Sequence, residues 1–490
     1  MIYLLSFTTQ HGFAQEVPPP STGLIHHIFN DSSKDDFKTL KLADVSNFNV
    51  VPNSRLNELP IVGREPPPSD QNILAPHISP KQTLNLNEVI LIAVARHPSI
   101  TSAIADLSTQ NSNIRVAQAA YYPQLSGGIQ TGDFDSAQRG RQVYTINASQ
   151  MVYDFGKTKT NVDIQKSKQV LEQANVLIAM DQIATVTSQA VFNVLRYRSL
   201  MNIAEKQLQG LQRLYEIARL RANAGISSQA DPVQAKSYVE YAQSYLITQQ
   251  SNLRQQEQKL RTLLGFDISA TQFMIPDSFI QTSGLYSAPQ LNTIPSMIAA
   301  EAEINVAKYE KEKTKLSPYP TFSLVGSVNK ALNGINPNTG RRNDTDSSIY
   351  LSMSSNFYQG GAIRAQINSA NYAEQAAKAK LDAAYLNVLQ STRNDMEIID
   401  NAQRQIEILR NREQSTEKTQ ELYEEQYKLG KRSILDLLSS EQSYHSSKAE
   451  RETVRFDIYN TITDYIAVVG KSRDVYDLNN QNIQGFEVQP

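Results

Sequence analysis

Apolar positions recur at helical spacing along two very long segments, 157–222 and 362–427. In the second segment, Ile363, Ile367 and Ala370 follow one another at intervals of four and three residues, as in a coiled-coil seam. At about 1.5 Å per residue, a helix of this length extends for about 100 Å. A compact domain cannot bury such a helix, because an ordinary globular helix has only about 11–12 residues. The pattern therefore predicts a wall of long helices packed side by side.

Four shorter segments alternate apolar and polar residues at every second position, which predicts β-strands. They are expected at about 123–131, 143–153, 320–330 and 348–357. Each has about ten residues, the length that a tilted strand needs to cross a bilayer. Aromatic residues near the strand ends suit an interfacial girdle; they are Tyr122, Tyr153, Tyr319, Phe357 and Tyr358. Two hairpins packed on soluble helices would show the same alternation, and this alternative stays open.

The chain contains an internal duplication. Six pairs share an offset of 205 residues: Tyr153 with Tyr358, Gly156 with Gly361, Gly225 with Gly430, Ser228 with Ser433, Asp231 with Asp436, and Gly265 with Gly470. Each copy reads as helix, strand, strand, long helix and shorter helix, over 84–280 and 290–470. Since four strands cannot close a barrel, several copies of the chain must share one, which predicts an obligate oligomer.

Three segments lie outside the duplication. Residues 1–14 are predicted to be a truncated signal peptide, because an apolar stretch from Ile2 precedes a small-residue site near Gly12. Residues 15–80 contain two proline triplets and predict an extended N-terminal arm. Residues 471–490 are predicted to be a polar C-terminal tail.

Composition excludes several classes of function. The 490 residues include 47 basic and 49 acidic side chains, so there is no basic footprint for nucleic acid. Cysteine is absent, which excludes disulfides, thiolate metal sites and cysteine nucleophiles. The tripeptide Gly156-Lys157-Thr158 copies the end of a P-loop, but Met151 stands where that motif requires glycine. We therefore expect no enzymatic activity, no cofactor and no metal site.

The turns that join the long and shorter helices carry the candidate functional residues. Gly225 and Gly430 suit left-handed helix ends. Asp231 and Asp436 each follow a serine by three residues, as in a capping box, so helix capping is the simplest role for both. Both turns lie about 100 Å of helix away from the strands. They are expected to form the opposite mouth of a tube.

The duplicated plan over about 84–470 resembles the TolC family of outer-membrane export channels. The most specific motif is Tyr427-x-x-Gly430-x-Arg432-x-Ile434-x-Asp436, and Ala224-Gly225-Ile226 followed by Asp231 is similar to its partner turn. The resemblance implies a mainly α fold with membrane β structure. Three chains would share a twelve-stranded β-barrel that continues into a long periplasmic α-helical barrel.

The resemblance also implies a location and partners. The protein would lie in the outer membrane of a Gram-negative bacterium, in contact with outer-membrane lipid, and extend into the periplasm. It would be a passive gated export duct of a tripartite efflux pump or a type I secretion system. Its partners would be a periplasmic adaptor (membrane fusion) protein and an inner-membrane pump of the ABC, RND or MFS type. The alternative from the residues alone is a soluble periplasmic coiled-coil structural or adaptor protein.

Individual roles carry over onto matching positions of the motif. Tyr427 and Asp231 resemble a hydrogen-bonded pair that holds the periplasmic entrance shut, and Arg432 resembles a second tether. Ala230 stands at the partner position of Arg432 and offers no side-chain acceptor. Asp436 resembles one ring of an acidic pore constriction. A second acidic ring would fall at Ser439, which is neutral. The helix-turn tips Gly225, Ile226 and Gly430 resemble positions where an adaptor docks.

Overall fold

The computed structural model describes residues 83–489, except 133–140, 333 and 337. The predicted signal peptide, 1–14, and the predicted arm, 15–80, lie outside the described residues. All described residues belong to one compact unit of the chain, His77–Pro490.

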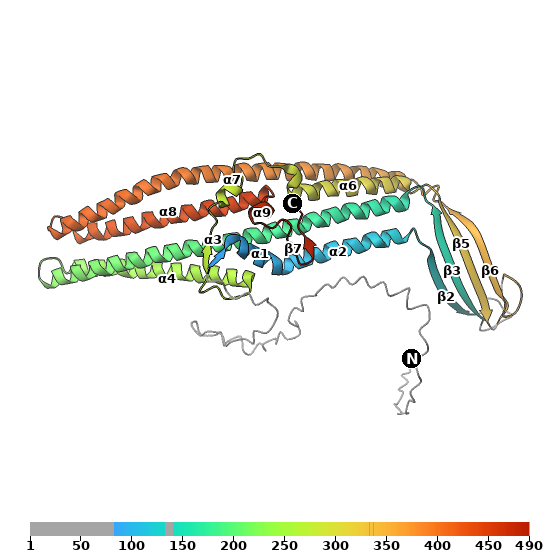
Figure 1. Cartoon of the computed structure of the whole chain (residues 1–490), viewed down its shortest axis with the longest axis horizontal. Helices are drawn as coiled ribbons and strands as arrows, with labels where there is room; N and C mark the ends of the chain where they lie inside the picture. Colours follow the sequence, from blue (N-terminus) through green and yellow to red (C-terminus); the bar gives the residue numbers. More distant parts are fainter. Residues whose placement is uncertain (1–82, 133–140, 333, 337, 490) are drawn as a thin grey trace, which may run out of the picture. The chain divides into compact units, whose positions relative to one another are not determined.

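The long helices lie side by side in four rows (Figure 1). The rows are α2 (Pro98–Ala119) with α4 (Ala230–Leu264), then α3 (Lys157–Asn223), then α6 (Pro295–Leu316) with α8 (Ile434–Val468), and finally α7 (Ala362–Lys428). Two shorter helices laid end to end cover each long helix. The predicted wall of laterally packed helices is therefore confirmed.

The inner and outer rows differ in burial. Helix α3 has neighbours on both sides and buries 24 of its 67 residues. Helix α7 has the same length but buries only eight, because α6 and α8 cover one side of it. The outer rows, α7 and α2 with α4, therefore keep a free flank within the described part of the chain.

The four predicted strands form one antiparallel sheet in the order β2-β3-β5-β6. The strands are β2 (Gln124–Gly132), β3 (Arg141–Tyr153), β5 (Thr321–Leu332) and β6 (Thr345–Ser354). Strand β6 ends at Ser354, so Phe357 and Tyr358 follow the strand instead of closing it, which corrects the predicted range 348–357. Strands β2 and β6 lie at the two edges of this sheet.

One face of the sheet is apolar. The register places Gly127 opposite Ile146, Ile146 opposite Val328, and Gly326 opposite Ile349, so these positions share a face. The exposed large apolar residues of that face are Leu125, Ile129, Tyr144, Ile146, Leu324, Val328, Ile349, Leu351 and Met353. On the opposite face the Ser327 and Ser348 hydroxyls are hydrogen-bonded at 2.8 Å. The exposed fraction of Ile349 is 80 %, so the helices do not cover this sheet as they would cover a soluble hairpin pair.

The helix predicted at the start of the first copy of the duplication is broken into two. Helix α1 (Leu86–Arg96) ends before His97, and α2 starts at Pro98. The break follows from Pro98, which lacks an amide hydrogen and disfavours helical geometry in the residue before it. Across the described residues no single helix is long and apolar enough to cross a membrane; α1 and α2 meet those limits only as a pair bent by 53°.

The C-terminal residues 471–489 differ from the predicted polar tail. They contain α9 (Ser472–Val475) and the short strands β7 (Asn482–Ile483) and β8 (Phe486–Glu487). Tyr476, Leu478 and Ile483 are buried in the main core, which includes the short helix α5 (Phe279–Thr282). The apolar residues of this segment form short groups among polar residues and follow no sustained helical or alternating period, so the sequence pattern did not predict their burial. A parallel pair, β1 (Thr83–Asn85) with β4 (Gln272–Met274), and the 3-10 turn η4 (Leu291–Thr293) complete the fold.

Candidate functional site

Glycines end both long helices at the tips far from the sheet. Gly225 has φ +73° and Gly430 has φ +74°, in the left-handed region that glycine adopts without strain. Beyond each glycine the next amide donates back into the helix, from Ile226 to the Arg221 carbonyl and from Lys431 to the Gln426 carbonyl, both at 2.9 Å. This bond pattern is a Schellman motif, and it turns the chain into α4 or α8. We call 221–231 and 427–436 the tip turns.

The two tip turns cap the next helix differently. At α8 the Ser433 hydroxyl accepts from the Asp436 amide at 3.2 Å, and the Asp436 carboxylate accepts from the Ser433 amide at 3.3 Å. This capping box, led by the Ser433 hydroxyl, lowers the pKa of Asp436. At α4 the Ser228 hydroxyl accepts instead from the Ala230 amide at 3.1 Å, and no side-chain cap bond forms at Gln229. The predicted capping box at Asp231 is therefore wrong.

Tyr427 lies at the junction of the two tip turns. Its exposed fraction is 6 %, and it belongs to a core cluster with Leu214 and Ala218 of α3. The guanidinium carbon of Arg221 lies 4.7 Å from the centroid of the Tyr427 ring. The Nη1 of Arg221 also donates to the Tyr427 carbonyl at 3.2 Å. Arg221 therefore joins the end of α3 to the end of α7.

The Tyr427 hydroxyl is buried and has no hydrogen-bond partner among the described residues. Burial raises the pKa of Tyr427; Arg221 opposes this rise, and the charge of Asp231 adds to it. Asp231 therefore acts on Tyr427 through its charge, and a direct bond between the two side chains is not present in the single chain.

Arg432 makes its contacts within the second tip turn and the adjoining end of α7. Its guanidinium carbon lies 4.4 Å from the centroid of the Tyr423 ring, and its Nε donates to the Gln426 side chain at 3.0 Å. Its Nη1 lies 3.8 Å from the Asp436 carboxylate. Arg432 and Asp436 therefore share one local cluster within the second tip turn.

Sequence reasoning missed Arg221. The duplication places Gln426 at the matching position of the second copy, so Arg221 is not part of the repeated pattern. The available signal was a cation in the last turn of one long helix and an aromatic residue, Tyr427, in the last turn of the other. The exposed fraction of Ile226, at the first tip, is 66 %, which leaves an apolar side chain in solvent there.

A sheet with one apolar face, joined to four rows of helices that end in capped turns, defines the class of outer-membrane channel proteins. The chain belongs to the outer membrane efflux protein family, whose model matches residues 89–266 and 290–470. These two matched segments fall within the two copies of the duplication. The resemblance to the TolC family is thereby confirmed, and so is the expectation that the protein is not an enzyme.

Several relatives support the same family. Outer membrane protein TolC of Escherichia coli is 21 % identical over 425 residues, covering 81 % of this chain and 85 % of the relative. Outer membrane efflux protein BepC of Brucella suis is 21 % identical over 368 residues, covering 73 % of this chain and 78 % of the relative. Among solved structures, the outer membrane protein VceC of Vibrio cholerae has a TM-score of 0.68 at 18 % identity, covering 79 % of this chain and 96 % of that chain.

Proposed function

We propose that three copies of this chain form a passive, gated export duct that spans the outer membrane and the periplasm. The observation that carries the proposal is the exposed apolar face of a four-stranded sheet whose edge strands, β2 and β6, are free to pair with other copies. Three sheets of four strands give twelve, enough to close around a lumen. The outer helical rows, α7 and α2 with α4, would meet between copies and continue the tube.

The duct works with partners that supply energy. A periplasmic adaptor and an inner-membrane pump of the ABC, RND or MFS type fit a tripartite efflux pump or a type I secretion system. The tips, at Gly225, Ile226 and Gly430, are the docking positions for the adaptor. The exposed fractions of Ile226, 66 %, and Leu429, 70 %, support this, since exposed apolar side chains at a surface favour a protein partner.

The proposed gate lies at the tip turns. Tyr427, Asp231 and Arg432 hold the closed mouth, and Arg221 links the two copies of the repeat through the Tyr427 ring. Asp436 forms an acidic constriction if three copies converge on the axis. Opening would then separate the end of α7 from the end of α3, which breaks the contacts of Arg221.

Reconstitution tests the duct. The purified protein in lipid should assemble as a trimer and conduct ions across a planar bilayer. A stable monomer that stays in solution without detergent after export would contradict the proposal. Outer-membrane fractionation separates this result from the alternative of a soluble periplasmic coiled-coil protein.

A separate variant tests the constriction. Asp436→Asn should weaken the block of conductance by a trivalent cation, because the ring of carboxylates is removed. Ser433→Ala is the matched control, since it weakens the same cap and leaves the carboxylate in place. Equal block in the wild type and Asp436→Asn would leave Asp436 with the capping role alone.

A further inference from the structure

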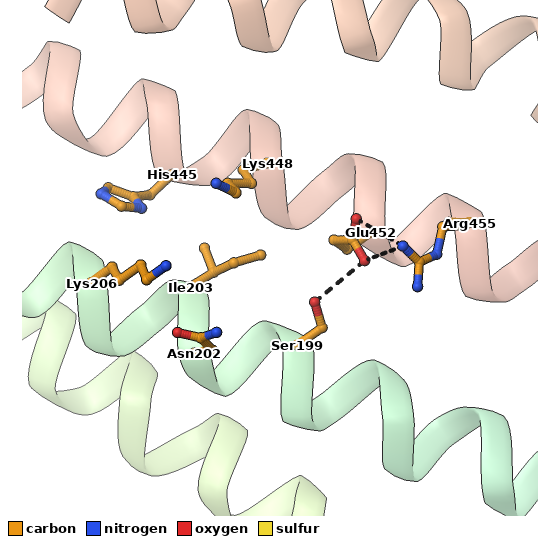
Figure 2. Close-up of a pocket in the computed structure, with 8 residues that line it drawn as sticks. All are labelled: Ser199, Asn202, Ile203, Lys206, His445, Lys448, Glu452 and Arg455. Carbon is orange, nitrogen blue, oxygen red and sulfur yellow. Dashed lines mark hydrogen bonds and ion pairs between the residues drawn. The ribbon is translucent and has the colours of Figure 1, made fainter. Parts of the chain in front are cut away.

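A polar cavity of about 280 Å³ lies between α3 and α8, away from the tip turns (Figure 2). Each helix supplies one stripe of its surface: Ser199, Asn202, Ile203 and Lys206 from α3, and His445, Lys448, Glu452 and Arg455 from α8. Both helices belong to inner rows of the wall, whereas copies of the chain would meet at the outer rows. Assembly therefore leaves the cavity open to one side of the wall.

One end of the cavity is already neutralised. The Glu452 carboxylate accepts a hydrogen bond from the Ser199 hydroxyl at 3.3 Å. The same carboxylate pairs with Arg455 at 3.2 Å and with Arg451 at 3.1 Å. These partners satisfy the charges at this end, so it offers no site for another ion.

The other end carries two lysines, beside the buried pair of His445 and Glu441. Figure 2 shows Lys206 and Lys448 toward the end of the cavity that holds His445, away from Ser199 and Glu452. Neither lysine pairs with a carboxylate in the described part of the chain; the Lys448 ammonium lies 5.6 Å from the centroid of the Tyr444 ring. Two ammonium groups that share a partly enclosed space repel each other, and a bound anion would offset that repulsion.

His445 adds a buried nitrogen to this end. Its exposed fraction is 6 %, and its Nε2 lies 3.2 Å from the Glu441 carboxylate. Gln420 donates to the other oxygen of Glu441, and Gly210 leaves the space that this carboxylate occupies. The bond at Nε2 fixes the ring, and the buried Nδ1 has no partner among the described residues. Because Nε2 contacts Glu441, the buried Nδ1 is the ring atom of His445 that remains for a ligand in the cavity.

We propose that this end of the cavity binds a small tetrahedral oxyanion of the phosphate or sulfate type. The ammonium groups of Lys206 and Lys448 are its ligands, and the side chains of His445 and Asn202 line the same space. Lys206 lies about 70 Å of helix from the sheet end of α3, at about 1.5 Å per residue. Lipid headgroups at the sheet cannot reach it, so the ligand is a free anion. Binding would brace α3 against α8.

Calorimetric titration of the full-length protein in detergent with inorganic phosphate tests the site. Chloride keeps the ionic strength constant. We expect saturable binding of one phosphate per chain. Lys206→Gln with Lys448→Gln should weaken it at least about tenfold, because two charge-assisted hydrogen bonds are lost. Lys259→Gln, an exposed lysine on α4, is the matched control and should bind phosphate as the wild type does.

Two results would overturn the proposal. One is phosphate binding of equal strength in the double lysine variant and the wild type. The other is a titration of the wild type with phosphate that does not saturate. Should the double variant lose its helical content, the single lysine variants carry the same comparison, with weaker binding expected in each.

Discussion

Replacing Arg221 with glutamine tests whether the contact between the tip turns holds the mouth closed. The change removes the cation from the Tyr427 ring, 4.7 Å away, and the charged donor to the Tyr427 carbonyl at 3.2 Å. A partly desolvated cation–π contact contributes about 1–2 kcal/mol. A hydrogen bond from a charged group contributes about 1.5–3 kcal/mol. Because glutamine keeps some packing and can still donate, we expect a net loss of about 2–4 kcal/mol per chain.

If the closed state alone keeps this contact, that loss shifts the balance toward the open state by about 30- to 1,000-fold, at about 1.4 kcal/mol for each factor of ten. The assay is single-channel conductance in a planar bilayer, where Arg221→Gln should conduct more than the wild type. Arg219→Gln is the control, because Arg219 lies on the same helix and pairs with Glu216 at the surface. Equal conductance in both variants, with a lower melting temperature for Arg221→Gln, would make the contact structural and refute the gate.

Three further changes have defined outcomes. Gly470→Ala combines φ +69° with backbone as close as 3.0 Å to the new Cβ, so its melting temperature should fall well below that of Gly430→Ala, which has φ +74° and open space. Burial raises the pKa of Asp181 to about 7, so the folded state keeps a proton that the unfolded chain loses. Stability should therefore fall as pH rises from about 4 to about 7, by up to about 4 kcal/mol from this group, and Asp181→Asn should reduce the slope in denaturant titrations. Ile349→Lys, on the apolar face of the sheet, should reduce the protein in the outer-membrane fraction, at a cost of about 2–4 kcal/mol, whereas Ser348→Lys on the opposite face should not.

The architecture could be predicted because its strongest sequence signals are periodic patterns of apolar residues and positions that only glycine occupies without strain. Long runs of apolar residues at helical spacing predict long helices, and the alternation of apolar and polar residues in four segments predicts strands. Gly225 and Gly430 occur at the same offset because each must adopt a positive φ at a helix end. Such positions repeat between the two copies, so the sequence alone revealed them.

The missed features depend on contacts between segments that no local pattern links. Arg221 contacts Tyr427 across about 200 residues of chain, and only folding brings them together. The break at Pro98 was visible in the sequence, but the helical periodicity on both sides of it obscured the change of direction. The buried tail residues Tyr476 and Leu478 belong to no periodic pattern, and their partners lie in helices far away in the sequence.

The capping of the two aspartates shows a second kind of limit. Asp231 and Asp436 occupy equivalent positions of the duplication, yet only Asp436 completes a capping box. The first tip turn binds its serine one residue earlier, at Ala230, so the same sequence pattern gives two local geometries. The two copies therefore share the glycines with positive φ at the helix ends, but they do not share the side-chain hydrogen bonds that follow.

The Glu441 side chain occupies the space beside Gly210, so the residues at these two positions, on different helices, constrain each other. With alanine at position 210, the side chain at position 441 would have to be shorter or turn away. Gln420 and His445 would then lose the acceptor that they share. These four positions should therefore covary among related channels, and a sequence that keeps the histidine without the glycine would have to orient its ring by another group.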